Sequence, residues 1–203
     1  MFDLPKSTEI RKQVHKKLIY SKFATELSGD KKDRFDADIS RIIITNEISE
    51  ASVNIKATDK VSSMFVIQIE LKTKNYNDRN IILVSKLFGQ NLLLVLHYED
   101  KYQLAIYETK LLKSDWKSEE EFSLKLNGLD LNVVWDNFVT QVSGINVEEG
   151  NTLVEQISIE TEKDKIKKQI EDLEWKARKE IQSKKKFEMF QQIKQYHKRL
   201  EEI

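Results

Sequence analysis

The stretch MFVIQIELK, residues 64–72, decides the fold. Its odd-numbered positions are all apolar. Its even-numbered positions begin with two apolar residues and continue with the polar Gln68, Glu70 and Lys72. Period-two alternation of this kind predicts a β-strand with one face buried and the other becoming polar toward its end. The rest of the chain is interpreted outward from this strand.

The residues that follow predict a β-α-β unit. Asn75–Asp78 is a turn whose Asn77 or Asp78 can cap a helix, and Gly89 suits the end of that helix. Asn91–Tyr98 is a nearly continuous apolar run, which is typical of a central strand covered on both faces. Glu99–Lys101 then predicts a hairpin turn, after which Tyr102–Tyr107 pairs back.

Helical spacing dominates the residues that precede residue 40. Ser7 or Thr8 can cap a helix, and the apolar residues after the cap recur every four positions. A second short helix carries Phe35 and Ile39 inward. The β-branched run Ile42–Thr45 and the alternating segment Ser52–Lys56 predict two further strands. The apolar residues of the first helix are Ile10, Val14 and Leu18.

The second half of the domain begins with a polar segment, residues 109–121, and apolar patterns return after it. Alternation over Phe122–Leu126 predicts a last strand, and Asp130 can cap a helix that Gly144 closes. Together these elements predict an α/β (α+β) domain over residues 1–150, with a mixed sheet of about five to six strands and flanking helices in αβββαββ order. A helix, three strands and a second helix–strand pair is also the core order of the restriction-endonuclease-like fold.

Residues 151–203 form a helical tail that contains no proline, and lysine and glutamate dominate it. Its apolar residues follow coiled-coil spacing, which falters at residues 183–186. Two alternatives remain, one long helix or a hairpin of two helices, and the break favours the hairpin. This stripe must pack on the first domain, on itself or on another chain, so we expect it to bind a protein partner or to form a homodimer. The stripe consists of Ile166, Ile170, Leu173, Ala177, Phe190, Ile193 and Leu200.

Composition excludes several classes of protein. The chain of 203 residues has no cysteine, which excludes disulfides, thiolate metal sites and a cysteine nucleophile. Its 34 basic and 34 acidic residues give zero net charge, so no globally basic surface for nucleic acid exists. The chain has no glycine-rich phosphate loop, no signal peptide and no apolar run that could span a membrane. We therefore expect a cytoplasmic protein.

Four segments of the chain, residues 4–10, 69–72, 98–103 and 124–131, carry a resemblance to a known family, together with the lysine- and glutamate-rich tail. With these segments the chain resembles the bacterial domain-of-unknown-function family 4391, and the resemblance covers essentially the whole chain. It implies gene neighbourhoods with helicases and DNA methyltransferases, hence an accessory subunit of an anti-phage or restriction-like defence system that docks on a helicase or another DNA-processing partner. No catalytic residue carries over. The chain has His15 where members often have proline, which leaves open whether the first helix breaks there.

Glu70 and Lys72 are the sharpest candidates for catalysis. Their spacing places both side chains on one strand face, as in metal-dependent nucleases, where the carboxylate holds Mg²⁺ and the lysine activates water. Such a site needs a second acid, for which Asp59 and Glu50 are the candidates. The competing interpretation is a charge pair on a solvated strand face. No cofactor is required unless the protein is a nuclease, which would use Mg²⁺.

The basic segment near the start of the chain is a candidate contact for DNA phosphates. A solvated helix face also accounts for it and is the favoured interpretation. His97 is interpreted as a hydrogen-bonded core histidine and Tyr102 as a packing residue. The candidate DNA-binding residues are Lys6, Arg11, Lys12, Lys16 and Lys17.

Overall fold

The computed structural model describes residues 2–89, 91–145, 148 and 151–203. The chain divides into two compact units, Met1–Gly144 and Ile145–Ile203. The predicted domain boundary at residue 150 lies outside the described residues. The predicted α+β class is confirmed: the first unit contains a six-stranded mixed sheet with helices, and the second is helical.

A β-α-β unit lies at the centre of the first unit, as predicted. Strands β3 (Ser63–Leu71) and β4 (Asn91–Tyr98) are parallel, and α4 (Asp78–Phe88) connects them. The Asn77 side chain accepts a hydrogen bond from the backbone of Arg79, and Gly89 ends the helix at a φ of 62°. Both caps follow from residue types that favour these positions.

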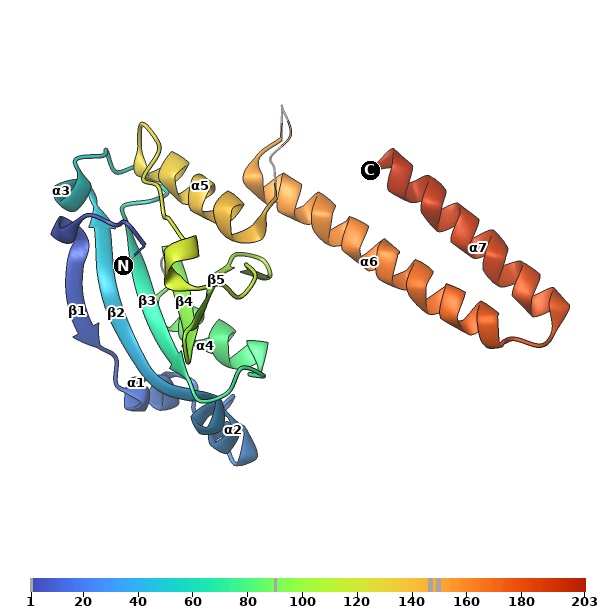
Figure 1. The fold of residues 1–203 in the computed structure, drawn as a ribbon, viewed down its shortest axis with the longest axis horizontal. Coiled ribbons are helices and arrows are strands. Elements are labelled where there is room, and N and C mark those ends of the chain that lie inside the picture. The colour runs from blue at the N-terminus through green and yellow to red at the C-terminus, as the bar shows by residue number, and fades with distance from the viewer. Residues whose placement is uncertain (1, 90, 146–147, 149–150) are drawn as a thin grey trace. The chain divides into compact units, whose positions relative to one another are not determined.

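The other strands extend this unit on both sides in chain order, β1-β2-β3-β4-β5-β6, and Figure 1 shows β1 to β5 side by side in this order. β3–β4 is the one parallel pair among the named strands, and the remaining neighbours are antiparallel. The hairpin between β4 and β5 confirms the predicted turn. The remaining strands are β1 (Glu9–Gln13), β2 (Ile39–Ser49), β5 (Lys101–Tyr107) and β6 (Leu111–Lys113).

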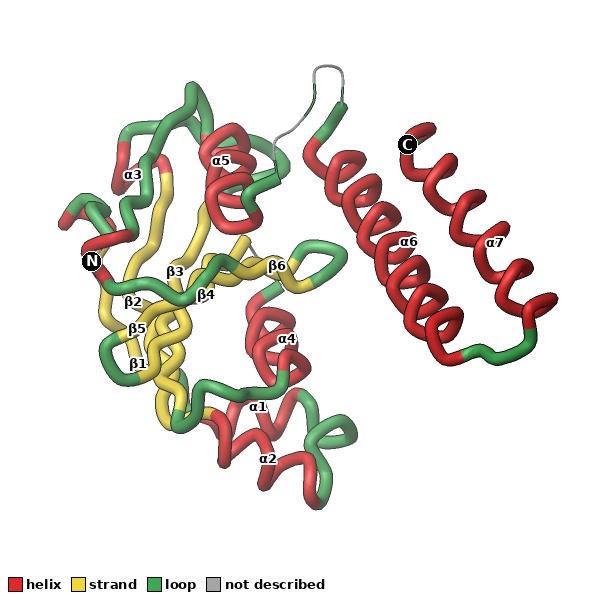
Figure 2. Tube along the Cα trace, turned by 45° about the vertical axis from the view of Figure 1, so that its right-hand side comes forward, coloured by secondary structure: helices red, strands yellow, loops and turns green. Residues whose placement is uncertain are grey.

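Three helices bury one face of the sheet. Ile19 of α1 (Lys16–Lys22), Phe35 of α2 (Asp30–Asp38) and Ile81 of α4 share one apolar cluster with Ile67 and Leu94 of the central strands. In contrast, α5 (Leu131–Ser143) contacts β5 and β6 and lies toward the other end of the sheet from α1 and α2 (Figures 1 and 2). As predicted, Asp130 caps α5 and Gly144 follows it.

The predicted first helix is wrong. A single 3₁₀ turn, η1 (Lys6–Thr8), leads into β1, and α1 begins only after His15, which is its N-cap. The i, i+4 spacing of Ile10 and Val14 imitates a helix, although Ile10 is 42% exposed on an edge strand. Thr8 fixes the start of β1, because its Oγ1 donates to the carbonyl oxygen of Pro5 at 2.7 Å and accepts from the buried Asn46 at 2.8 Å.

Two predicted strands are also wrong, so the αβββαββ order does not hold as written. Ser52–Lys56 begins as α3 (Glu50–Val53), because Ser49 and Ser52 form a capping box and Asn54 adopts left-handed backbone at a φ of 56°. Phe122–Leu126 is irregular, after the 3₁₀ turn η2 (Glu119–Glu121). β1 and β6 replace these strands in the sheet.

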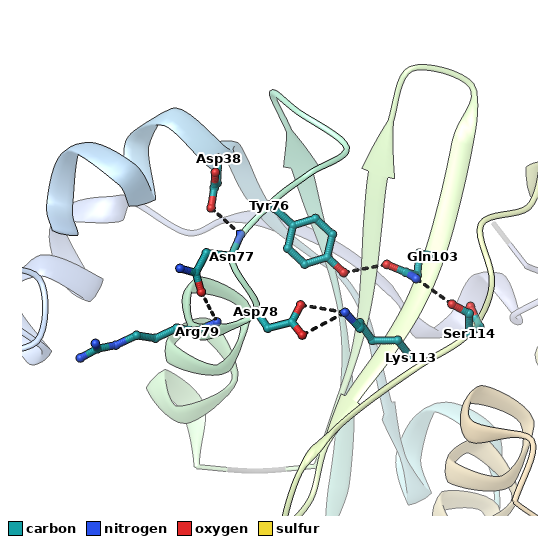
Figure 3. Close-up of polar contacts among 8 residues, drawn as sticks. All are labelled: Asp38, Tyr76, Asn77, Asp78, Arg79, Gln103, Lys113 and Ser114. Carbon is teal, nitrogen blue, oxygen red and sulfur yellow. Dashed lines mark hydrogen bonds and ion pairs between the residues drawn. The ribbon is translucent and has the colours of Figure 1, made fainter. Parts of the chain in front are cut away.

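A polar network fixes the start of α4 against its neighbours (Figure 3). The buried Asp38, at the end of α2, accepts from the backbone N–H of Asn77 and from the Asn80 side chain, both at 2.8 Å. Tyr76 donates to the Gln103 side chain at 2.6 Å, and Gln103 donates to the carbonyl of Ser114 at 2.7 Å. The crossover between the parallel strands is therefore bonded to both α2 and β5.

The second unit is an antiparallel helical hairpin, which confirms the favoured alternative for the tail. Helices α6 (Leu153–Lys179) and α7 (Ser183–Glu202) lie side by side (Figures 1 and 2). Arg199 of α7 forms an ion pair with Glu162 of α6 across the hairpin. Within the described residues, no helix is long and apolar enough to cross a membrane.

Asp38→Ala tests the network at α4. We expect it to lower the free energy of unfolding by about 2–3 kcal/mol, because it leaves the buried Asn80 amide without its charged acceptor. Urea denaturation followed by circular dichroism measures the loss. The matched control is Asp33→Ala on the exposed side of α2, for which we expect a loss below about 1 kcal/mol. An equal loss in both variants would contradict the role of Asp38.

Candidate functional site

Strand register aligns four chemically different side chains across one face of the sheet. Arg41 of β2 lies opposite Glu70 of β3, Glu70 lies beside His97 of β4, and His97 lies opposite Tyr102 of β5. Neighbours in register point to the same face of a sheet. We call Arg41, Glu70, His97 and Tyr102 the transverse row.

Glu70 is the centre of the transverse row. His97 Nδ1 lies 2.7 Å from Glu70 Oε2, and Gln68 Nε2 donates to Glu70 Oε1. The side chains of His97 and Glu70 are 21% and 29% exposed. Both carboxylate oxygens therefore have partners within the sheet, although solvent still reaches the pair.

Aromatic rings close the other end of the row. The His97 and Tyr102 rings stack with centroids 4.3 Å apart and planes 17° apart. Phe2 packs edge-on against both Tyr102 and Phe122. Partial burial raises the pKa of Tyr102, and the nearby negative charges of Glu119 and Glu70 raise this pKa further.

The arrangement can hold an imidazole in one tautomer. An ionised Glu70 only accepts hydrogen bonds, so it favours the proton on His97 Nδ1 and leaves Nε2 as the lone-pair nitrogen. No hydrogen-bond partner of Nε2 occurs within the described residues. A carboxylate–imidazole pair of this kind can take up a proton from a bound ligand.

The second residue of the Glu-x-Lys pattern does not join Glu70. Lys72 follows the end of β3, and its Nζ donates to the carbonyl oxygen of Asp36 in α2 at 2.7 Å. The strand alternation that would place both side chains on one face ends at Leu71. Lys72 is therefore hydrogen-bonded to α2 and does not share a site with Glu70.

The proposed second acids lie at the other end of the sheet. Glu50 follows Ser49, whose partner in β3 is Ser63, and Asp59 lies in the loop before Ser63. Glu70 lies seven positions after Ser63, which is about 23 Å along the strand. A single metal ion cannot bind Glu70 together with either acid, and the described residues hold no cluster of three potential ligands. The residues around Glu70 thus do not fit a Mg²⁺ site.

The candidate DNA-binding residues do not form one basic face. Arg11 and Lys12 lie where the pairing of β1 is irregular, and they line different concavities, Arg11 beside Arg41 and Lys12 beside Leu18. Lys16 bonds Asp36 at 2.8 Å and the carbonyl of Ile39, so it joins α1 to α2. Lys6 and Lys17 are exposed in separate elements, η1 and α1.

Most of the predicted partner-binding stripe is buried inside the hairpin. Ile166 and Ile170 of α6 pack with Ile193 of α7, and Leu173 and Leu200 extend the contact. Ala177 is buried as well. Phe190 is not part of this seam, because it is 51% exposed. The coiled-coil spacing thus located a seam, and the hairpin fills that seam itself.

Sequence reasoning missed the pairing of Glu70 with His97. Both residues lie near the end of an apolar strand, and that shared position was the available signal because side chains at the carboxyl ends of parallel strands meet. The exposed Phe187, one turn before Phe190 on α7, was recognised in the sequence only as a neighbour of the basic run 184–186.

The family model for Domain of unknown function (DUF4391) matches residues 2–200, which is nearly the whole chain. No curated protein and no solved structure matches.

The charges near Tyr102 predict how its titration responds to substitution. Glu119→Gln and Glu70→Gln should each lower the pKa of Tyr102, with the larger effect at Glu119, because less negative charge opposes the phenolate. NMR titration of the tyrosine ring carbons measures both shifts. Tyr76 is the internal control: burial and then Asp78 raise its pKa, so neither substitution should change it. If the pKa of Tyr102 were the same in both variants as in the unchanged protein, the placement of Tyr102 close to Glu70 and Glu119 would be contradicted.

Proposed function

The chain belongs to the DUF4391 family, and we propose that it acts as a protein-interaction subunit that docks on its partner through the outer face of α7. We further propose that the partner is a DNA-processing protein of a bacterial defence system, such as a helicase. The resemblance supports the identity of the partner. The exposed phenylalanines of α7 support the mode of docking.

Phe187 and Phe190 carry the proposal. They are 63% and 51% exposed and lie one helical turn apart. Single exposed apolar residues are normal, but phenylalanine is enriched in protein interfaces, and two on one helix face suit insertion into an apolar groove. Because the seam of the hairpin is already filled, these rings are not needed for its packing.

The charge of α7 indicates what surrounds such a groove. Residues 183–202 contain six basic and three acidic side chains. Lys194 and Lys198 follow Phe187 at positions i+7 and i+11, so they share its side of the helix. We therefore expect a partner groove with an apolar floor and an acidic rim. The α7 outer face comprises Lys184, Phe187, Phe190, Lys194 and Lys198.

A Mg²⁺-dependent nuclease is the second candidate function. The strand order β1-β2-β3-β4, with α4 between β3 and β4 and Glu70 near the end of the third strand, favours it, whereas α1 and α2 between β1 and β2 depart from the core order expected for restriction-endonuclease-like proteins. The hydrogen bonds of Glu70 and the direction of Lys72 weigh against it. Order of elements alone is an analogy and identifies no chemistry.

Removing the exposed rings tests the docking proposal. We expect the double variant Phe187→Gln, Phe190→Gln of the full-length chain to lose the DNA-processing protein that the unchanged chain retains in affinity purification from its native cell. Calorimetry with that purified partner should show a Kd at least about 30-fold higher, as for loss of one interface hot spot.

Trp175→Gln is the matched control. Trp175 is also more than half exposed, but it lies two residues from both Leu173 and Ala177 and so on the side of α6 opposite the seam. This variant should bind the partner as the unchanged chain does. Equal loss in both variants, or no loss in the double variant, would contradict docking through α7.

Glu70→Gln decides the second candidate. If the protein is an interaction subunit, this variant should protect cells from phage as well as the unchanged chain does, and neither purified protein should cleave DNA with Mg²⁺. Mg²⁺-dependent cleavage that Glu70→Gln abolishes, without a change in thermal stability, would establish the nuclease instead.

A further inference from the structure

A concavity of about 400 Å³ opens on the sheet face that carries the transverse row, over β1, β2 and β3. Gln68 lines it and also bonds Glu70, so the concavity adjoins the row. Its volume lies in the range of small-molecule sites. The polar and charged residues that line it are Glu9, Arg11, Gln13, Arg41, Thr45, Asn46 and Gln68, with Ile43 as the apolar member.

Irregular pairing brings both arginines to this concavity. The register of β1 shifts between Glu9 and Lys12, where Arg11 adopts left-handed backbone at a φ of 45°. The register of β2 shifts between Ile39 and Arg41. Bulges redirect side chains, and strained backbone at a residue other than glycine is concentrated at functional sites.

The two guanidinium groups lack strong partners. Arg41 lies opposite Glu70 in the register, but its guanidinium makes no ion pair with Glu70 or with any other described residue. Arg11 is paired with Glu9 at 3.8 Å, and its side chain is 80% exposed. An ion pair this long and exposed contributes little. Both groups are therefore available to an anion.

We propose that the β1–β3 concavity binds a nucleoside phosphate. The planar guanidinium fork matches a phosphate group in two hydrogen bonds, so Arg11 and Arg41 bind the phosphate. Glu9, the one acid among the described residues that line the concavity, accepts from a ribose hydroxyl, as acidic residues do in dinucleotide sites. The amide of Gln13 supplies a further donor and acceptor for the base. This site is independent of docking through α7.

Isothermal titration calorimetry of the full-length chain with adenosine 5′-monophosphate (AMP) tests the proposal. We expect one binding site, with inorganic phosphate and adenosine each binding at least about tenfold more weakly than AMP. Arg41→Gln and Arg11→Gln should each weaken AMP binding at least about tenfold, the effect of losing a hydrogen bond to a charged group. Arg79→Gln, an exposed arginine of α4 outside the concavity, is the matched control and should bind normally.

Glu9→Gln separates a nucleotide site from a general anion site. The unchanged chain should prefer AMP over its 2′,3′-dideoxy analogue, and Glu9→Gln should remove this preference while circular dichroism shows an intact fold. Absence of AMP binding at millimolar concentration would overturn the proposal. So would phosphate binding as tight as AMP binding, or AMP binding that neither Arg11→Gln nor Arg41→Gln weakens.

Discussion

The parallel pairing of β3 with β4 is the constraint on which the first unit depends. Parallel neighbours need a crossover, and α4 supplies it over the apolar face of the sheet. The buried carboxylate of Asp38 ties the start of this helix to α2. With the crossover fixed, Glu70 lies beside His97, and the antiparallel neighbours add Arg41 and Tyr102 to the same row.

The two units meet their packing requirements in different ways, and this difference shapes the proposed functions. The sheet buries one face under α1, α2 and α4 and leaves polar side chains near the end of β3 on the other face. The hairpin fills its own seam with Ile166, Ile170 and Ile193, so its remaining exposed rings are not required for folding. Recognition of small anions therefore suits the sheet, and recognition of protein suits α7.

Local patterns predicted the elements whose signals agree with one another. β3, α4 and β4 combine clear periodicity with caps at Asn77 and Gly89, and all three were found. The prediction of the first helix was wrong because Ile10 and Val14 have helical spacing by coincidence. The prediction of a strand over Ser52–Lys56 was wrong because serine capping outweighs the β-branched content of that segment. The site was harder to predict, since the contact between Glu70 and His97 depends on register across 27 residues of chain. The position of both residues near the ends of apolar strands indicates that they can meet, but no local pattern encodes the register itself.

The central claim is that strand register places the side-chain carboxyl group of Glu70 against Nδ1 of His97. Nitrogen-15 NMR of the histidine ring tests it most directly, because the two ring nitrogens of a neutral imidazole have distinct shifts. The account predicts that neutral His97 carries its proton on Nδ1, and that Glu70→Ala removes this preference. A neutral His97 protonated on Nε2 in the unchanged protein would contradict the register, and with it the transverse row.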